Sequence, residues 1–258
     1  ISSEVRFDFN NNLWGYAGQA RLAGADIYGV DFIDSIQSLK ADVVFNNKEL
    51  NSDNITAQIW KNPVRGKLSI KDFNAPVINL SLSASPELSY LSNILKEKFK
   101  LSVPLELKGN SSLTANYISD LKKKDSPVLN ARIDLNKASL KFSNVEIDEI
   151  NGPLYLSFNR LEAKGLDLRY QGLPYKLSFA LDDFIKPEVK LKVSSDGLLA
   201  SADFLVEEKS VNIADFSVKY LNSQLKTAGN FNFSNFDINL IGAVNLNLKD
   251  LNKPLQKF

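Results

Sequence analysis

The sequence predicts a mainly β protein, an antiparallel meander of strands with one short helix. Three observations predict this fold: apolar and polar residues alternate along most of the chain, short turn-forming segments separate the alternating runs, and one run recurs. The recurring run reads PVINLSLSA from Pro76, PVLNARIDL from Pro127 and PEVKLKVSS from Pro187, and a version without the proline, DINLIGAVNLNL, begins at Asp237. The copies start about 50 to 60 residues apart, which is typical of a β architecture built from repeated units.

Each alternating run is predicted to be a strand with one apolar and one polar face, because successive strand side chains point to opposite faces. In the copy from Pro76, Ile78 and Leu80 alternate with Asn79 and Ser81. Similar runs follow in chain order at residues 5–9, 43–45, 55–59, 68–70, 101–107, 154–158, 166–170, 175–181, 216–220 and 231–233. Connections such as YQGLP and DDFIKP are too short for helical crossovers, so the strands are predicted to be antiparallel.

One segment, SPELSYLSNILKEKF, departs from this alternation. Ser85 and Pro86 are typical of a helix start, and Leu88 and Leu91 share one helical face. We predict a short helix near residues 86–98. Its apolar stripe is explained most simply as a lid against the sheet, and a partner-binding helix is the alternative.

The composition excludes several classes of function. The 258 residues include no cysteine and no histidine, so disulfides, thiolate nucleophiles, histidine-dependent triads and Cys/His metal sites are ruled out. The net charge is +1 without a long basic block, which argues against nucleic-acid binding. The doublets Asp182–Asp183 and Glu207–Glu208 cannot present two carboxylates to one substrate, because adjacent strand residues face opposite sides. We therefore expect no enzymatic activity, no cofactor and no metal, and a hydrolase that uses carboxylates alone is the alternative within the enzyme class.

The chain also has no apolar run that approaches the roughly 18 residues of a membrane-spanning helix. It begins ISSEVRF, without an initiator methionine or a signal-peptide pattern. The chain is therefore expected to be either a processed form or a segment of something longer. We expect a single segment over residues 1–258 of a longer protein, and if that protein is anchored in a membrane, we expect its anchor outside this segment.

The number of apolar strand faces raises a packing question, because one predicted helix cannot cover them all. Three solutions satisfy the alternation. The sheet can curl until it closes on itself, it can dock on another protein, or it can wrap an apolar ligand. Alternation alone does not choose among them.

Three longer stretches resemble the AsmA-like family of bacterial envelope proteins, which includes the YhdP and TamB relatives. The first is INGPLYLSFNRLEAKGLDLRYQGLPYKLSFAL, where a strand with a turn glycine is followed by alternating leucines, G-x-P and a further strand. The second is VNIADFSVKYLNSQLKTAGNFNFSNFDINLIGAVNLNLKDL, and the third is ELSYLSNILKEKFKLSVPLELKG. The resemblance covers most of the chain after about Gly24.

The resemblance implies a bridge-like lipid-transfer protein. Its sheet is expected to be elongated and strongly twisted, and to curl into an open groove that is apolar inside and polar outside. The expected ligands are phospholipids or other acyl-chain lipids, carried through the periplasm between inner and outer membranes in support of outer-membrane biogenesis. The protein to which the segment belongs is expected to be anchored in the inner membrane. The expected groove residues are Ile78, Leu80, Leu82, Leu129, Ile133, Leu154, Leu156, Phe158, Leu166, Leu168, Leu177, Phe179, Val189, Leu191, Val193, Phe231, Phe233, Ile238, Leu240, Val244 and Leu246.

A second function from another class accounts for the same alternation. In this alternative the chain is a structural or adhesive β-sandwich module, whose apolar faces close on each other and whose polar faces bind a partner. Co-purifying phospholipid distinguishes the two, because an open groove retains lipid and a dry sandwich does not.

Overall fold

The computed structural model describes residues 2–8, 13–30, 34–59, 61–89, 105–123, 127–142, 144–232 and 237–250. The chain divides into two compact units, one made of residues 1–134 with 140–143 and the other of residues 135–139 with 144–258. That residues 1–258 form one continuous segment of a longer protein stays a prediction.

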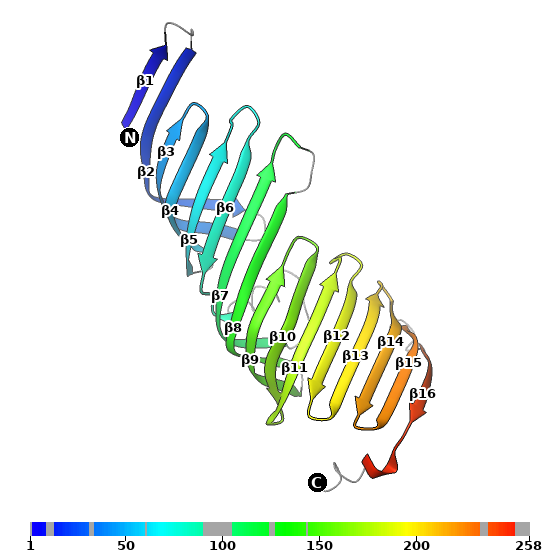
Figure 1. Ribbon diagram of the computed structural model, residues 1–258. Coiled ribbons are helices and arrows are strands. Elements are labelled where there is room, and N and C mark those ends of the chain that lie inside the picture. Colours follow the sequence, from blue (N-terminus) through cyan, green and yellow to red (C-terminus); the bar gives the residue numbers. More distant parts are fainter. Residues whose placement is uncertain are drawn as a thin grey trace. The chain divides into compact units, whose positions relative to one another are not determined.

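The structure confirms a mainly β fold of antiparallel strands (Figure 1). The strands of the first unit are β1 (Ser2–Asp8), β2 (Leu13–Val30), β3 (Asp34–Asn46), β4 (Glu49–Ile59), β5 (Asn62–Lys71), β6 (Val77–Ala84), β7 (Leu105–Asp120) and most of β8 (Val128–Phe142). The strands of the second unit are β9 (Val145–Leu156), β10 (Arg160–Tyr170), β11 (Leu173–Asp182), β12 (Glu188–Ser195), β13 (Leu198–Val206), β14 (Ser210–Tyr220), β15 (Ser223–Asn232) and β16 (Asp237–Asn245). Within each unit the strands lie side by side in sequence order.

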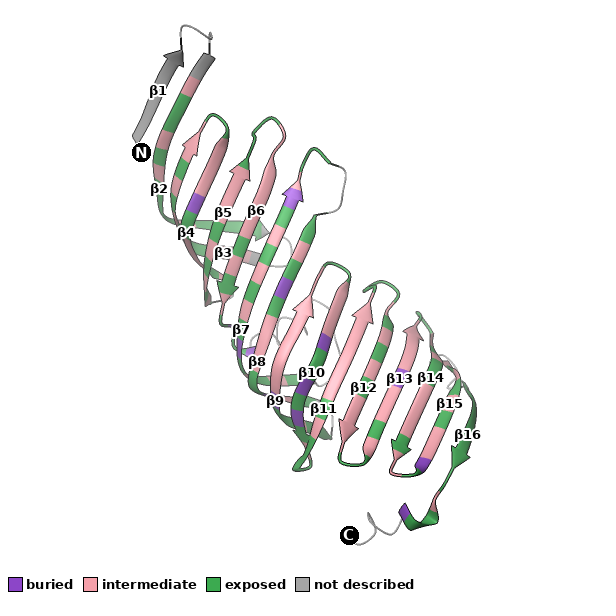
Figure 2. Cartoon of the chain, viewed as in Figure 1, coloured by how far each residue is buried: buried purple, intermediate pink, exposed green. Residues whose placement is uncertain are grey.

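Each unit consists of one sheet layer that does not close on itself, as far as the described strands show. The packing contacts between these strands likewise follow the sequence order, without a second layer stacked on the sheet. Most of their residues are half-buried or exposed (Figure 2). Among the described residues, no large side chain is less than 2% exposed. These strands therefore do not form the double layer of a β-sandwich.

The repeat seen in the sequence corresponds to strand starts and to a recurring hairpin. The four copies form β6, β8, β12 and β16. In the hairpins β5–β6 and β11–β12 an aspartate begins the loop with a positive φ, 54° at Asp72 and 56° at Asp183. The Asp72 carboxylate accepts a hydrogen bond from the backbone N–H of Asn74, and that of Asp183 accepts one from Ile185. Such local bonds explain why aspartate tolerates this turn conformation.

Bulges interrupt several of the long strands. The β10–β11 register shifts between Lys164 and Leu166, where Gly165 has a φ of 136°. The strands β2, β3, β4, β13 and β14 also carry register shifts. A bulge bends its strand and increases the local twist, so each unit has the means to curve its sheet.

The helix predicted near residues 86–98 is described only at its start. Leu88 and Ser89 are helical and Leu88 is buried, whereas residues 90–98 lie outside the described residues. The predicted start at Pro86 is two residues too early. The Pro86 carbonyl accepts a hydrogen bond from the Ser111 hydroxyl, and Glu87 forms an antiparallel bridge with Asn110. Glu87 is thus paired with another part of the chain, and the helix begins after it.

Candidate functional site

Cross-strand pairing places most of the apolar strand residues of the second unit on one face of its sheet. Leu191 of β12 lies between Phe179 of β11 and Ala202 of β13. Ala202 in turn lies beside Phe216 of β14. Directly paired residues project to the same side, so these four side chains share what we call the apolar face. The residues that alternate with these along each strand, such as the exposed Lys190, lie on the opposite, polar face. We call the odd or even position of a residue along its strand its parity.

Most of the predicted groove residues between β9 and β15 lie on this apolar face. The register that places them pairs Leu154 with Ala163, Leu156 with Leu161, Leu166 and Val193 with Leu177, Leu168 with Tyr175, Val189 with Leu181, and Phe231 with Val211. Leu166 and Leu168 are buried, and the other predicted residues of this set are half-buried. The single layer thus leaves an apolar surface partly open.

The first unit has an apolar face of its own. Its predicted residues pair across β5, β6 and β7: Ile78 with Ile70 and Ser119, Leu80 with Leu68 and Tyr117, and Leu82 with Gly66 and Ala115. On β8, Leu129 and Ile133 are half-buried, and they alternate with the exposed Asn130 and Arg132. The parity read from the sequence therefore agrees with the burial of these strands.

One predicted residue, Phe158, lies outside the cross-strand pairs of the apolar face. Phe158 is not on a strand, because β9 ends at Leu156 and Phe158 lies half-exposed in the turn before β10. The prediction extended the alternating run of Leu154 and Leu156 by one step too many, because a turn residue can match the spacing of a strand by chance. Phe233 lies outside the described residues.

The predicted residues of the fourth copy are exposed. Ile238, Leu240 and Val244 pair with Phe231, Gly229 and Leu225 of β15, so they continue the apolar face. No described strand lies on the far side of β16, and all of its residues are exposed. Leu246, which follows the end of β16, is 58% exposed.

The sequence-based prediction missed a polar border of the apolar face. The hairpins β10–β11, β12–β13 and β14–β15 are joined by two-residue turns, and we call this border of the second unit the turn edge. The opposite border, with the longer loops at residues 157–159, 183–187 and 207–209, is the loop edge. The residues of the apolar face nearest the turn edge include Tyr170, Tyr175, Ser195, Tyr220 and Ser223. Their parity was visible in the sequence, but their position at one border follows only from the register.

Charged groups on the polar face near the loop edge are paired with one another. The Arg160 guanidinium donates to both oxygens of Asp182, at 2.6 and 2.8 Å, and to Glu162 at 2.8 Å. Lys164 lies 3.0 Å from Glu162 and 5.5 Å from the centre of the Tyr155 ring. Such a network stabilises the pairing of neighbouring strands.

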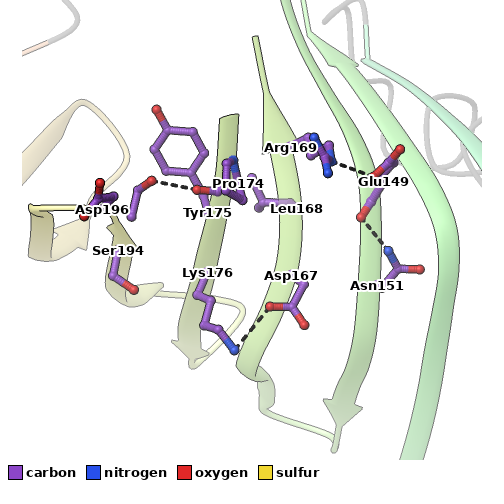
Figure 3. A pocket seen from close by; sticks show the side chains of 11 residues that line it. Glu149, Asn151, Asp167, Leu168, Arg169, Pro174, Tyr175, Lys176, Ser194 and Asp196 are labelled. Atoms are coloured by element: carbon purple, nitrogen blue, oxygen red, sulfur yellow. Dashed lines mark hydrogen bonds and ion pairs between the residues drawn. The ribbon is translucent and has the colours of Figure 1, made fainter. Parts of the chain in front are cut away.

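An open depression of about 560 Å³ lies between β9 and β12 (Figure 3). Arg169 forms an ion pair with Glu149 at 2.7 Å, and Lys176 forms one with Asp167 at 3.3 Å. These pairs hold adjacent strands together. The depression is lined mainly by such charged and polar side chains, so the apolar face remains the stronger candidate for a binding surface.

We expect the Arg160 network to make stability sensitive to acid. Hydrogen bonds from Arg160 and Lys164 hold the pKa of the Glu162 carboxyl below its ordinary value. A depressed folded-state pKa means that this stabilisation is complete above the unfolded-state pKa and is lost as the pH falls through the folded-state pKa. Between about pH 6 and about pH 3, wild type should therefore lose slightly more thermal stability than Glu162→Gln. Unfolding curves across this range measure the difference.

The matched control for this prediction is Glu208→Gln, which changes an exposed carboxylate in the loop between β13 and β14. Its pH dependence should follow wild type. Equal acid sensitivity of Glu162→Gln and wild type would show that the network does not contribute.

The described residues contain no group of three or more acidic, histidine or cysteine residues that could hold a metal ion. No helix among them is long and apolar enough to cross a membrane. Comparisons of the chain with protein-family models, curated proteins and solved structures found no match.

Proposed function

We propose that this chain is a non-enzymatic lipid-binding segment whose apolar sheet faces carry phospholipid acyl chains. The protein to which it belongs would move lipid through the periplasm between the inner and outer membranes, in support of outer-membrane biogenesis. The observation that carries the proposal is the partly open apolar face, made of uninterrupted cross-strand rows such as Phe179–Leu191–Ala202.

The energetics of acyl chains support this ligand. Each CH₂ group moved from water to an apolar surface gains about 0.8 kcal/mol when fully buried, so even partial cover by an apolar sheet favours a long chain. The sheet gains as well, because a chain lying on Phe179 and Leu191 removes their exposed apolar surface from water. No catalytic group is required.

Two further points support the envelope setting. The resemblance of three long stretches to the AsmA-like family implies a lipid-transfer role in the bacterial envelope. The single-layered sheet in sequence order also suits a groove that lengthens by the addition of units. Both membranes would be contacted through other parts of the protein.

The proposal predicts that lipid accompanies the purified protein. After detergent-free purification, organic extraction and mass spectrometry should recover phospholipid in a fixed ratio to protein, and native mass spectrometry should show the same mass increment. A preparation unfolded in denaturant and refolded without lipid should take up phospholipid again from vesicles.

A lipid-free protein that takes up nothing from vesicles would contradict the proposal. If that protein also forms dimers in solution, its apolar faces are covered by another copy. The structural or adhesive function would then replace the lipid-binding one.

A further inference from the structure

The apolar face of the second unit changes in character from one border to the other. Near the loop edge its paired residues are entirely apolar: Leu181 with Val189, Val189 with Phe204, Val206 with Val211, and Val211 with Phe231. Apolar side chains continue into the loops, where Phe184 is 46% and Ile185 90% exposed. The apolar face therefore stays apolar up to the ends of its strands at the loop edge, and the loops beyond carry both apolar side chains and charged ones such as Asp183 and Glu208.

The turn edge of the same face carries hydroxyl groups. Pairs at this border are Leu168 with Tyr175, Tyr170 with Leu173, Ser195 with Leu198, Leu198 with Tyr220, and Tyr220 with Ser223. The rings of Tyr170 and Tyr175 lie 6.5 Å apart. Tyrosine has an apolar ring and a polar tip, which suits it to a boundary between apolar and aqueous surroundings.

Polar groups extend this border at β15. The buried Asp250 carboxylate accepts hydrogen bonds from the Ser223 hydroxyl at 3.1 Å and from the Asn222 backbone N–H at 2.8 Å. A uniformly apolar partner would leave the tyrosine hydroxyls at this border without water or a polar partner, which is unfavourable. An amphiphile matches both borders.

We propose that a phospholipid lies on the second unit in one orientation, with its head group at the turn edge and its acyl chains directed along the strands toward the loop edge. This inference rests on the proposed function and adds the orientation of the bound phospholipid to it. The length is adequate: six residue steps from Val189 to Ser195 span about 20 Å at about 3.3 Å each. One leaflet of a bilayer, half of a hydrocarbon core about 30 Å thick, needs about 15 Å.

The test measures which part of a bound lipid lies near each border. The chain has no cysteine, so one introduced cysteine is a unique labelling site. Ser195→Cys places a small fluorophore at the turn edge, Val206→Cys places it at the loop edge, and Lys192→Cys places it on the polar face as a control. Each labelled protein is loaded with phosphatidylcholine that carries a nitroxide quencher either on the head group or near the end of an acyl chain.

We expect the head-group nitroxide to quench the label at 195 several-fold more than the label at 206, and the chain-end nitroxide to show the reverse order. The label at 192 should be quenched least by both. Equal quenching at 195 and 206, or the opposite order, with lipid bound would overturn the orientation and leave lipid binding intact. If neither lipid binds and extraction of the unlabelled protein also finds none, the proposed function fails and the orientation with it.

A second measurement does not depend on labels. The double variant Tyr175→Phe and Tyr220→Phe removes two hydroxyls from the turn edge but keeps both rings. Loss of two hydrogen-bonding groups should weaken phosphatidylcholine binding about tenfold. The control Tyr155→Phe, on the polar face beside Glu162, should bind as wild type does. Unchanged binding by the folded double variant would count against a head group at this border.

Discussion

Leu191→Asp is expected to leave the protein folded and to lower its bound phospholipid at least about tenfold. Leu191 is half-buried in the row between Phe179 and Ala202. With lipid absent, the new carboxylate stays partly hydrated, because no second layer of described strands covers the row. With lipid present it would touch acyl chains, and a charge within hydrocarbon costs about 2.5–3.5 kcal/mol or more, where about 1.4 kcal/mol is already a tenfold change in binding.

The matched control for Leu191→Asp is Lys192→Asp, one position along the same strand and on the polar face. Its cross-strand neighbours are Ser178 and Ser201, whereas an aspartate at Lys190 would face Asp203 and introduce a repulsion. Thermal unfolding and lipid extraction should show Lys192→Asp to be close to wild type in both respects. Unfolding of Leu191→Asp far below the control would indicate a closed, dry core around Leu191. Normal folding with undiminished lipid would show that acyl chains do not touch this row.

Gly229→Ala is expected to detach β16 from β15. A Cβ at Gly229 would overlap the backbone carbonyl of Asn239 on β16, and the φ of Gly229 is 150°. The unfavourable φ alone costs about 1–3 kcal/mol, and the overlap with backbone adds to this cost, since a strand cannot move aside as a flexible side chain can. Hydrogen exchange should report the effect as lost protection along Asp237–Asn245.

Gly165→Ala is the corresponding control, because Gly165 has a φ of 136° but no atom lies within 4 Å of the place that an added methyl group would occupy. It should destabilise the bulge in β10 through backbone strain alone, by about 1–3 kcal/mol, with β16 still protected. Equal protection of β16 in Gly229→Ala and wild type would mean that the pairing of β15 with β16 accommodates the added methyl group, and the prediction would be wrong.

The alternation of residues predicted the strands well because each strand of a single-layered sheet has one partly covered face along most of its length. Leu177, Phe179 and Leu191 could be assigned to one side from parity alone. Parity fails where a strand ends or changes phase. Phe158 has the right spacing but follows the end of β9, and the bulge at Gly165 shifts the parity of β10 in a way that depends on its pairing with β11.

The candidate site was predictable in composition but not in its two-sided character. Tyr175, Ser195 and Tyr220 are far apart in the sequence, and only the hairpin registers bring them to the same border of the sheet. A sequence gives the face of each residue, whereas its distance from a border depends on where the neighbouring strands turn. The exposure of β16 likewise depends on which strands lie beside it.

The sequence order of the strands has a consequence for how the chain acquires its structure. Within each unit every described strand lies beside the strand just before it in the sequence, so the pairing of these described strands requires no loop closure between distant segments. During synthesis, which begins at the N-terminus, the chain can therefore add one hairpin after another to the growing edge of its sheet, as repeat proteins do. Until the next strand arrives, that edge presents unpaired N–H and C=O groups, and binding by a chaperone at this stage would protect the nascent sheet from pairing with another chain.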